Sequence, residues 1–127
     1  MDKKILIVDD EPHIRLLMAQ TLEELEDEGV EVLIAENGEE AIETIKLEKP
    51  DLVFLDVMMP KMNGFDVCYA VKNNLDIKDV YIIMLTAKGQ EFDKEKGQQV
   101  GADLYMTKPF DPDEVVEKSY EILGLEY

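Results

Sequence analysis

Near the start of the chain stands Ile5-Leu6-Ile7-Val8-Asp9-Asp10, an apolar run that ends directly in two adjacent carboxylates. A short apolar run closed by polar residues is typical of a buried β-strand. Three later runs also end in residues that can carry chemistry: 52–55 ends in Asp56, 81–85 in Thr86, and 104–106 in Thr107-Lys108-Pro109. If these strands are parallel, their carboxyl ends share one edge of a sheet and the polar side chains converge there.

The predicted cluster at this edge suits a particular kind of chemistry. Carboxylates are ligands for a hard divalent cation, whereas a hydroxyl and an ammonium group suit a phosphoryl group. Taken singly, Asp10 and Asp56 fit a turn or a helix N-cap equally well. The repetition favours a site, because the remaining apolar run, 30–35, ends in Glu36-Asn37-Gly38, which is ordinary turn chemistry.

Length and composition limit the classes of protein that fit this chain. Its 127 residues, 46% of them hydrophobic, suffice for one core, and we interpret residues 1–127 as a single domain. The net charge of −17 argues against direct binding to nucleic acid or to an anionic membrane, because both require a basic surface. The single cysteine, Cys68, excludes an internal disulfide. We find no signal segment and no apolar run near the ~18 residues of a membrane span, and therefore expect a cytoplasmic protein.

Helical periodicity follows each predicted strand. Apolar spacing predicts one helix from Pro12 to near Gly29, whose buried stripe contains Ile14, Leu17, Met18, Thr21, Leu22 and Leu25. Further helices are predicted at 39–48, at 64–73, at 91–100 and after Asp111. The segment 91–100 is the weakest of these, because Gly97 costs about 1 kcal/mol relative to Ala in a helix. Five β/α repeats predict an α/β fold, a doubly wound five-stranded parallel sheet covered on both faces.

Five short motifs stand in a fixed order along the chain. They are Val8-Asp9-Asp10-Glu11-Pro12, Leu55-Asp56-Val57-Met58-Met59-Pro60 with Asn63-Gly64, Leu85-Thr86-Ala87, Gly101-Ala102-Asp103 and Lys108-Pro109-Phe110. Together they resemble the receiver domain of two-component response regulators, and the resemblance covers nearly the whole chain. It implies a flavodoxin-like receiver fold with the strand order 2-1-3-4-5.

The resemblance also implies catalytic roles at the predicted edge. Asp56 would accept a phosphoryl group and form an aspartyl phosphate. Thr86 would donate a hydrogen bond to the bound phosphoryl group, and Lys108 would pair with its oxygens. The Lys108–Pro109 peptide bond would be cis, as in the family.

A Mg²⁺ ion would be the cofactor of such a site. The resemblance implies that Asp10, Asp56 and the backbone carbonyl of Met58 would hold the ion, while Asp9 would act mainly through metal-bound water. Mg²⁺ retains several waters and prefers one or two carboxylates plus phosphate oxygens, which suits an open edge of a sheet.

The leading hypothesis is a phosphorylation-dependent response regulator that signals by a conformational switch. Its partners would be a sensor histidine kinase or a phosphotransfer protein and a downstream protein target. It would not be an enzyme in the usual sense, because it would catalyse only its own phosphorylation and dephosphorylation. In the winged-helix branch of the family an acid commonly supports dimerisation at the position of Leu104, so Leu104 leads us to expect a monomer.

Two other functions share parts of this pattern. A flavin electron carrier has the same fold class, but it needs a Ser/Thr/Gly-rich phosphate loop after the first strand. Here that loop is Asp9-Asp10-Glu11-Pro12, which would repel a phosphate and lacks one amide donor. A metal-dependent phosphatase with an aspartyl nucleophile usually carries a second acid two residues later, where this chain has Met58.

Overall fold

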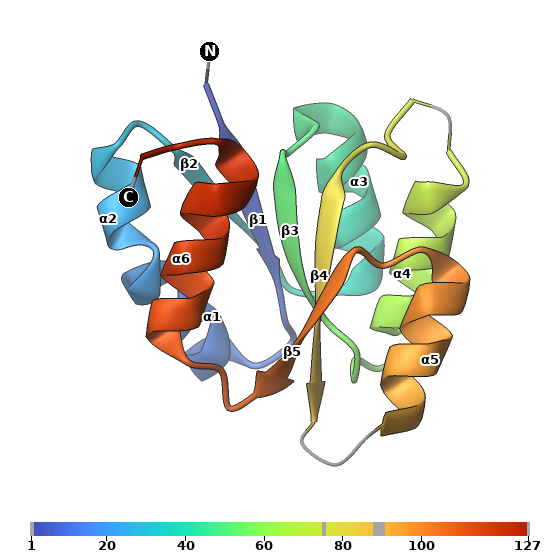
Figure 1. The fold of residues 1–127 in the computed structure, drawn as a ribbon. Helices are drawn as coiled ribbons and strands as arrows, with labels where there is room; N and C mark the ends of the chain where they lie inside the picture. Colours follow the sequence, from blue (N-terminus) through green and yellow to red (C-terminus); the bar gives the residue numbers. More distant parts are fainter. Residues whose placement is uncertain (1, 75, 88–90, 127) are drawn as a thin grey trace.

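A parallel five-stranded sheet forms the centre of the molecule, in the order β2-β1-β3-β4-β5 (Figure 1). The structure, a computed structural model, describes residues 2–74, 76–87 and 91–126, with side chains except at 91–94. The strands are β1 (Lys4–Val8), β2 (Glu31–Ala35), β3 (Leu52–Asp56), β4 (Tyr81–Ala87) and β5 (Leu104–Lys108). The predicted fold class and strand order are therefore confirmed.

Helices cover both faces of this sheet (Figure 1). One layer contains α1 (Pro12–Thr21), α2 (Glu23–Asp27) and α6 (Pro112–Leu123), and the other contains α3 (Gly38–Glu48), α4 (Gly64–Lys72) and α5 (Glu91–Val100). Successive residues of β1 alternate between the two cores, so Ile5 and Ile7 face the first layer while Leu6 and Val8 face the second. Because both faces are covered, β1 stays apolar until it reaches the carboxyl edge.

Local sequence signals set the start of the helices that follow β3 and β5. Asn63 caps α4, since its side chain accepts a hydrogen bond from the Asp66 amide at 3.0 Å and the Asp66 carboxylate accepts one from the Asn63 amide at 3.1 Å. Asp111 caps α6 by accepting from the Asp113 amide at 2.9 Å. Each cap stabilises the first turn of its helix, and therefore fixes where the loop after β3 or β5 ends.

The prediction of one helix from Pro12 to Gly29 was wrong, because the helix is interrupted at Leu22. The Thr21 hydroxyl donates to the Leu17 carbonyl at 2.8 Å, an interaction that favours bending. Leu17 itself is 45% exposed and does not belong to the buried stripe. Leu22 remains fully buried, so the break leaves this apolar anchor in place.

Within the part of the chain that the structure describes, every helix is too short or too polar to cross a lipid bilayer.

Candidate functional site

The predicted site lies where β1, β3, β4 and β5 end, at the edge marked by the arrowheads of β4 and β5 in the lower part of Figure 1. Asp9 follows β1 and is completely buried, while Asp56 closes β3 with 2% of its surface exposed. Thr86 in β4 is equally buried, and Lys108 is the last residue of β5. The strand register explains the convergence, because neighbouring parallel strands end at the same level.

Lys108 joins the two buried carboxylates. Its Nζ lies 3.1 Å from Asp9 Oδ2 and 3.2 Å from Asp56 Oδ1. Burial lowers the pKa of Lys108, but the charge of Asp56 and the hydrogen bond and charge of Asp9 outweigh it, so the pKa is raised above its ordinary value. The Lys108 side chain is therefore a fixed cation shared by both acids. The Lys108–Pro109 peptide bond is cis, as the resemblance implied.

Asp56 is a carboxyl group under electrostatic strain. Burial, and after it the negative charge of Asp9, raises its pKa from 3.8 to about 6, although Lys108 acts in the opposite direction. Its Oδ1 accepts from Lys108 and, at 3.4 Å, from the Met58 amide. Its Oδ2 is buried and has no hydrogen-bond partner among the described residues. A buried carboxylate oxygen without a partner is unusual, and it is a position from which a new bond can form.

The three acids also satisfy the first requirement for a cation site. Asp9, Asp10 and Asp56 each offer an oxygen, and these oxygens lie within 4.8 Å of one another. Asp9 is occupied on both sides, by the Glu11 amide at 3.0 Å on Oδ1 and by Lys108 on Oδ2. Asp10 is exposed, and within the described ranges its carboxylate has no hydrogen bond or ion pair. An all-oxygen donor set with a free carboxylate and an unpartnered Asp56 oxygen fits Mg²⁺.

Thr86 and Met58 occupy the predicted positions without showing the predicted contacts. The Thr86 hydroxyl donates to the Met106 carbonyl at 3.5 Å, the outer limit for a hydrogen bond, and no contact between described residues joins it to Asp56. The Met58 side chain is 71% exposed, next to the acceptor loop. The roles implied for the Thr86 hydroxyl and the Met58 carbonyl therefore remain predictions.

Two residues at this edge have contacts that sequence reasoning missed. Arg15 of α1 donates from Nη1 to the Asp9 carbonyl at 2.8 Å, and from Nη2 to Glu36 Oε1 at 3.1 Å. The sequence could have pointed to Arg15, because it is the only arginine of the chain and stands one turn into the helix that follows Asp9 and Asp10. Gly64 was expected only to start a helix, but a Cβ there would stand 2.4 Å from the Asp56 carbonyl oxygen.

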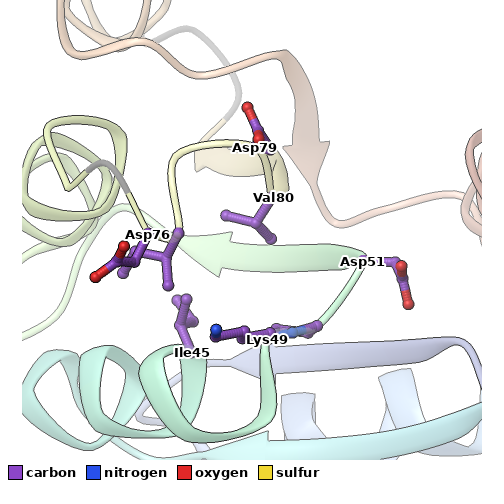
Figure 2. Close-up of a pocket in the computed structure, with 8 residues that line it drawn as sticks. Ile45, Lys49, Asp51, Asp76, Asp79 and Val80 are labelled. Atoms are coloured by element: carbon purple, nitrogen blue, oxygen red, sulfur yellow. The ribbon is translucent and has the colours of Figure 1, made fainter.

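A hollow of about 240 Å³ lies at the opposite edge of the sheet from these acids, between the end of α3 and the segment before β4. Asp51, Asp76 and Asp79 line it, but Figure 2 shows their carboxylates pointing in different directions. Asp51 is already engaged, because its Oδ2 accepts from the Lys4 amide at 2.8 Å. These acids do not converge on one point as the acids near Lys108 do.

Known proteins share both the sequence and the fold. The sequence profile described as the response regulator receiver domain matches residues 5–120. The alkaline phosphatase synthesis transcriptional regulatory protein PhoP of Bacillus subtilis is 48% identical over 124 residues, which cover 97% of this chain and 49% of PhoP. The phosphate regulon transcriptional regulatory protein PhoB of Pseudomonas aeruginosa is 46% identical over 121 residues, which cover 95% of this chain and 52% of PhoB.

Among solved structures, the chemotaxis response regulator CheY4 of Vibrio cholerae has a TM-score of 0.84 at 34% identity, covering 96% of this chain and 99% of that one. The chain spans about half the length of the two curated relatives but nearly all of CheY4. The similarity therefore extends over the whole sheet and includes the edge where the acids meet.

Proposed function

The chain belongs to the response regulator receiver domain family, and we propose that Asp56 accepts a phosphoryl group from a sensor histidine kinase or a phosphotransfer protein. Because this family consists of signalling proteins, its match favours a response regulator over the flavin carrier and the phosphatase considered from the sequence. The observation that carries the proposal is Asp56 itself, a buried carboxylate whose Oδ1 is held by Lys108 while its Oδ2 has no hydrogen-bond partner among the residues that the structure describes.

The geometry suggests how the residues of this chain would act. With a pKa of about 6, Asp56 is mostly ionised at neutral pH and can attack as a nucleophile. Its Oδ2 would form a bond to phosphorus while the bond from phosphorus to the donor nitrogen breaks, and the electron pair would leave with that nitrogen. Lys108 stands beside Asp56 and would balance the charge of the phosphoryl oxygens. The Thr86 hydroxyl would give up its long hydrogen bond to the Met106 carbonyl and donate instead to a phosphoryl oxygen.

We propose that the reaction requires Mg²⁺, which when bound neutralises charge on the phosphoryl oxygens. Asp10 and Asp56 would hold the ion together with the Met58 carbonyl. The occupied carboxylate of Asp9 suits an indirect contact, because both of its oxygens already accept hydrogen bonds. The carboxylate of Asp10 suits a direct contact, because it is exposed and forms no hydrogen bond or ion pair with the residues that the structure describes.

The proposal extends to partners in a limited way. A phosphorylated receiver would change its affinity for a downstream protein, and we expect this chain to do so as a monomer. PhoP and PhoB are transcriptional regulators by name, but this chain matches only about half of each. Its net charge of −17 argues against direct binding of nucleic acid, so such binding by residues 1–127 is not proposed. The single domain over 1–127 and the cytoplasmic location stay predictions.

Phosphorylation with a small donor tests the proposal. Purified protein incubated with acetyl phosphate and Mg²⁺ should gain the mass of one phosphoryl group, which alkali removes. Asp56→Asn should abolish this gain, whereas Asp79→Asn should retain it, since that carboxylate is 94% exposed at the opposite edge. Full labelling of Asp56→Asn would refute the assignment of the acceptor. Equal labelling in excess chelator would refute the role of the metal.

A further inference from the structure

Arg15 makes two contacts that join three segments around the acidic cluster. Its Nη1 donates to the backbone carbonyl of Asp9 at 2.8 Å, and its Nη2 donates to Glu36 Oε1 at 3.1 Å in the loop between β2 and α3. The side chain is only 12% exposed, whereas that of Glu36 is 62% exposed. The guanidinium group is thus held between the end of β1 and the loop after β2, and not on a solvated helix face.

The carbonyl that Arg15 holds belongs to the peptide unit between Asp9 and Asp10. Because a peptide unit is planar, fixing the direction of this carbonyl also fixes the Asp10 amide and the position of the Asp10 Cα. Asp9 has further restraints of its own, from the Glu11 amide and from Lys108. For the Asp10 carboxylate the described residues provide no hydrogen bond or ion pair, so its direction depends on its backbone.

We propose that Arg15 is a positioning residue for a divalent cation, which acts through the Asp9 carbonyl to aim the Asp10 carboxylate at Asp56. This inference rests on the proposed metal site. A planar guanidinium group presents several N–H donors in a fixed fork, so it can bridge two acceptors in different segments. A lysine keeps the charge, but its three donors share one nitrogen atom at the end of a shorter side chain. It therefore cannot reproduce the planar fork that directs Nη1 to the carbonyl and Nη2 to Glu36.

The positioning role and a purely electrostatic role predict opposite results. As a charge alone, Arg15 would repel a cation, so Arg15→Met would tighten Mg²⁺ binding and Arg15→Lys would leave it unchanged. As a positioning group, Arg15 acts like the partners that orient metal ligands, whose loss typically costs 10–100-fold in affinity. We therefore expect Arg15→Lys to weaken Mg²⁺ binding about 10-fold. Arg15→Met should also weaken Mg²⁺ binding, but less, because removing the positive charge also removes its repulsion of the cation and this partly offsets the lost positioning.

A comparison of two metals distinguishes positioning from a general loss of structure. Mg²⁺ demands near-octahedral geometry, whereas Ca²⁺ accepts flexible coordination. A misdirected Asp10 carboxylate should therefore reduce Mg²⁺ affinity more than Ca²⁺ affinity. Calorimetric titration of each metal into metal-free wild type, Arg15→Lys, Arg15→Met and Glu36→Gln measures both affinities. Glu36→Gln is the matched control, because the Gln amide oxygen can still accept from Nη2 while the bond from Nη1 to the Asp9 carbonyl stays in place. Its Mg²⁺ affinity should stay within about twofold of wild type.

Each result of the titration bears on one proposal or on both. If wild type does not bind Mg²⁺, the metal site itself is refuted and this inference falls with it. If wild type binds but Arg15→Lys stays within twofold of it, or loses both metals equally, the metal site stands and the positioning role is refuted. A selective loss of Mg²⁺ by Arg15→Lys supports it. Should Arg15→Met fail to fold, Arg15→Lys alone carries the comparison.

Discussion

Replacing Asp56 by Asn should stabilise the metal-free protein at neutral pH and do so less at acid pH. Asn keeps the size of the side chain and an oxygen that can accept from Lys108, but it removes a charge that is buried beside Asp9. The folded state raises the pKa of Asp56 from 3.8 to about 6, because burial and the charge of Asp9 outweigh Lys108. Ionisation of Asp56 is therefore less favourable in the folded than in the unfolded protein.

The magnitude follows from proton linkage. Between 3.8 and about 6 the folded protein binds more protons at Asp56 than the unfolded one, so the free energy of unfolding of wild type falls as pH rises through this window. Each pH unit between the two values corresponds to 1.36 kcal/mol, so the full difference is about 3 kcal/mol. The loss is complete above the folded pKa. The advantage of Asp56→Asn should thus grow by about 2–3 kcal/mol from about pH 4 to about pH 8.

Urea unfolding of both proteins in chelator, at several pH values across this range, measures the difference. Asp10→Asn is the matched control, because it removes a nearby carboxylate that is exposed and leaves the buried Asp56 in place. Saturating Mg²⁺ should narrow the gap at pH 8, since it binds the folded wild type. A difference between Asp56→Asn and wild type that does not change with pH would refute the reasoning.

Two further predictions concern the surroundings of Asp56. Lys108→Met removes the cation that lies 3.1 Å from Asp9 and 3.2 Å from Asp56, so urea unfolding at pH 8 should show a loss of about 3 kcal/mol in the free energy of unfolding. The loss should shrink at acid pH as Asp56 becomes protonated, and an equal loss at both pH values would contradict this cause. Gly64→Ala should destabilise the protein by about 2 kcal/mol despite the better helix propensity of Ala, because its Cβ would stand 2.4 Å from the Asp56 carbonyl oxygen. The control is Gln98→Ala at an exposed position of α5. If Gly64→Ala has the same urea midpoint as this control, the close contact relaxes freely and the prediction is wrong.

Much of the fold followed from local patterns. The four apolar runs that end in polar residues became β1, β3, β4 and β5, each in the predicted place, and β2 became the edge strand without site residues. Asn63-Gly64 began a helix as expected. These features depend on side-chain alternation, caps and turn residues, which act over a few positions and so are written in the sequence. The strand order, by contrast, came from the resemblance to a known family.

Residue identity also predicted which side chains gather at the carboxyl edge, but not their electrostatic state. Asp9, Asp56 and Lys108 meet because neighbouring parallel strands end at the same level in the register of the sheet. Both oxygens of Asp9 accept hydrogen bonds, Asp10 is exposed, and Asp56 Oδ2 has no partner within the described part of the chain; these differences depend on the depth at which each side chain lies. Burial and the distance between charges set a pKa, and neither quantity is present in a linear sequence.

The sequence by itself determined the alternation of strands and helices and the placing of acids, a hydroxyl and a lysine at strand ends. Only the tertiary structure explained why a glycine stands at position 97, where helix propensity alone makes it destabilising. A Cβ at Gly97 would lie 2.6 Å from the Tyr105 ring and 3.2 Å from the Met84 sulfur, so its absence lets α5 lie close on β4 and β5. The same holds for the contact of Arg15 with the Asp9 carbonyl. Local propensity acts between neighbours in the chain, whereas close packing is decided between residues that only folding brings together.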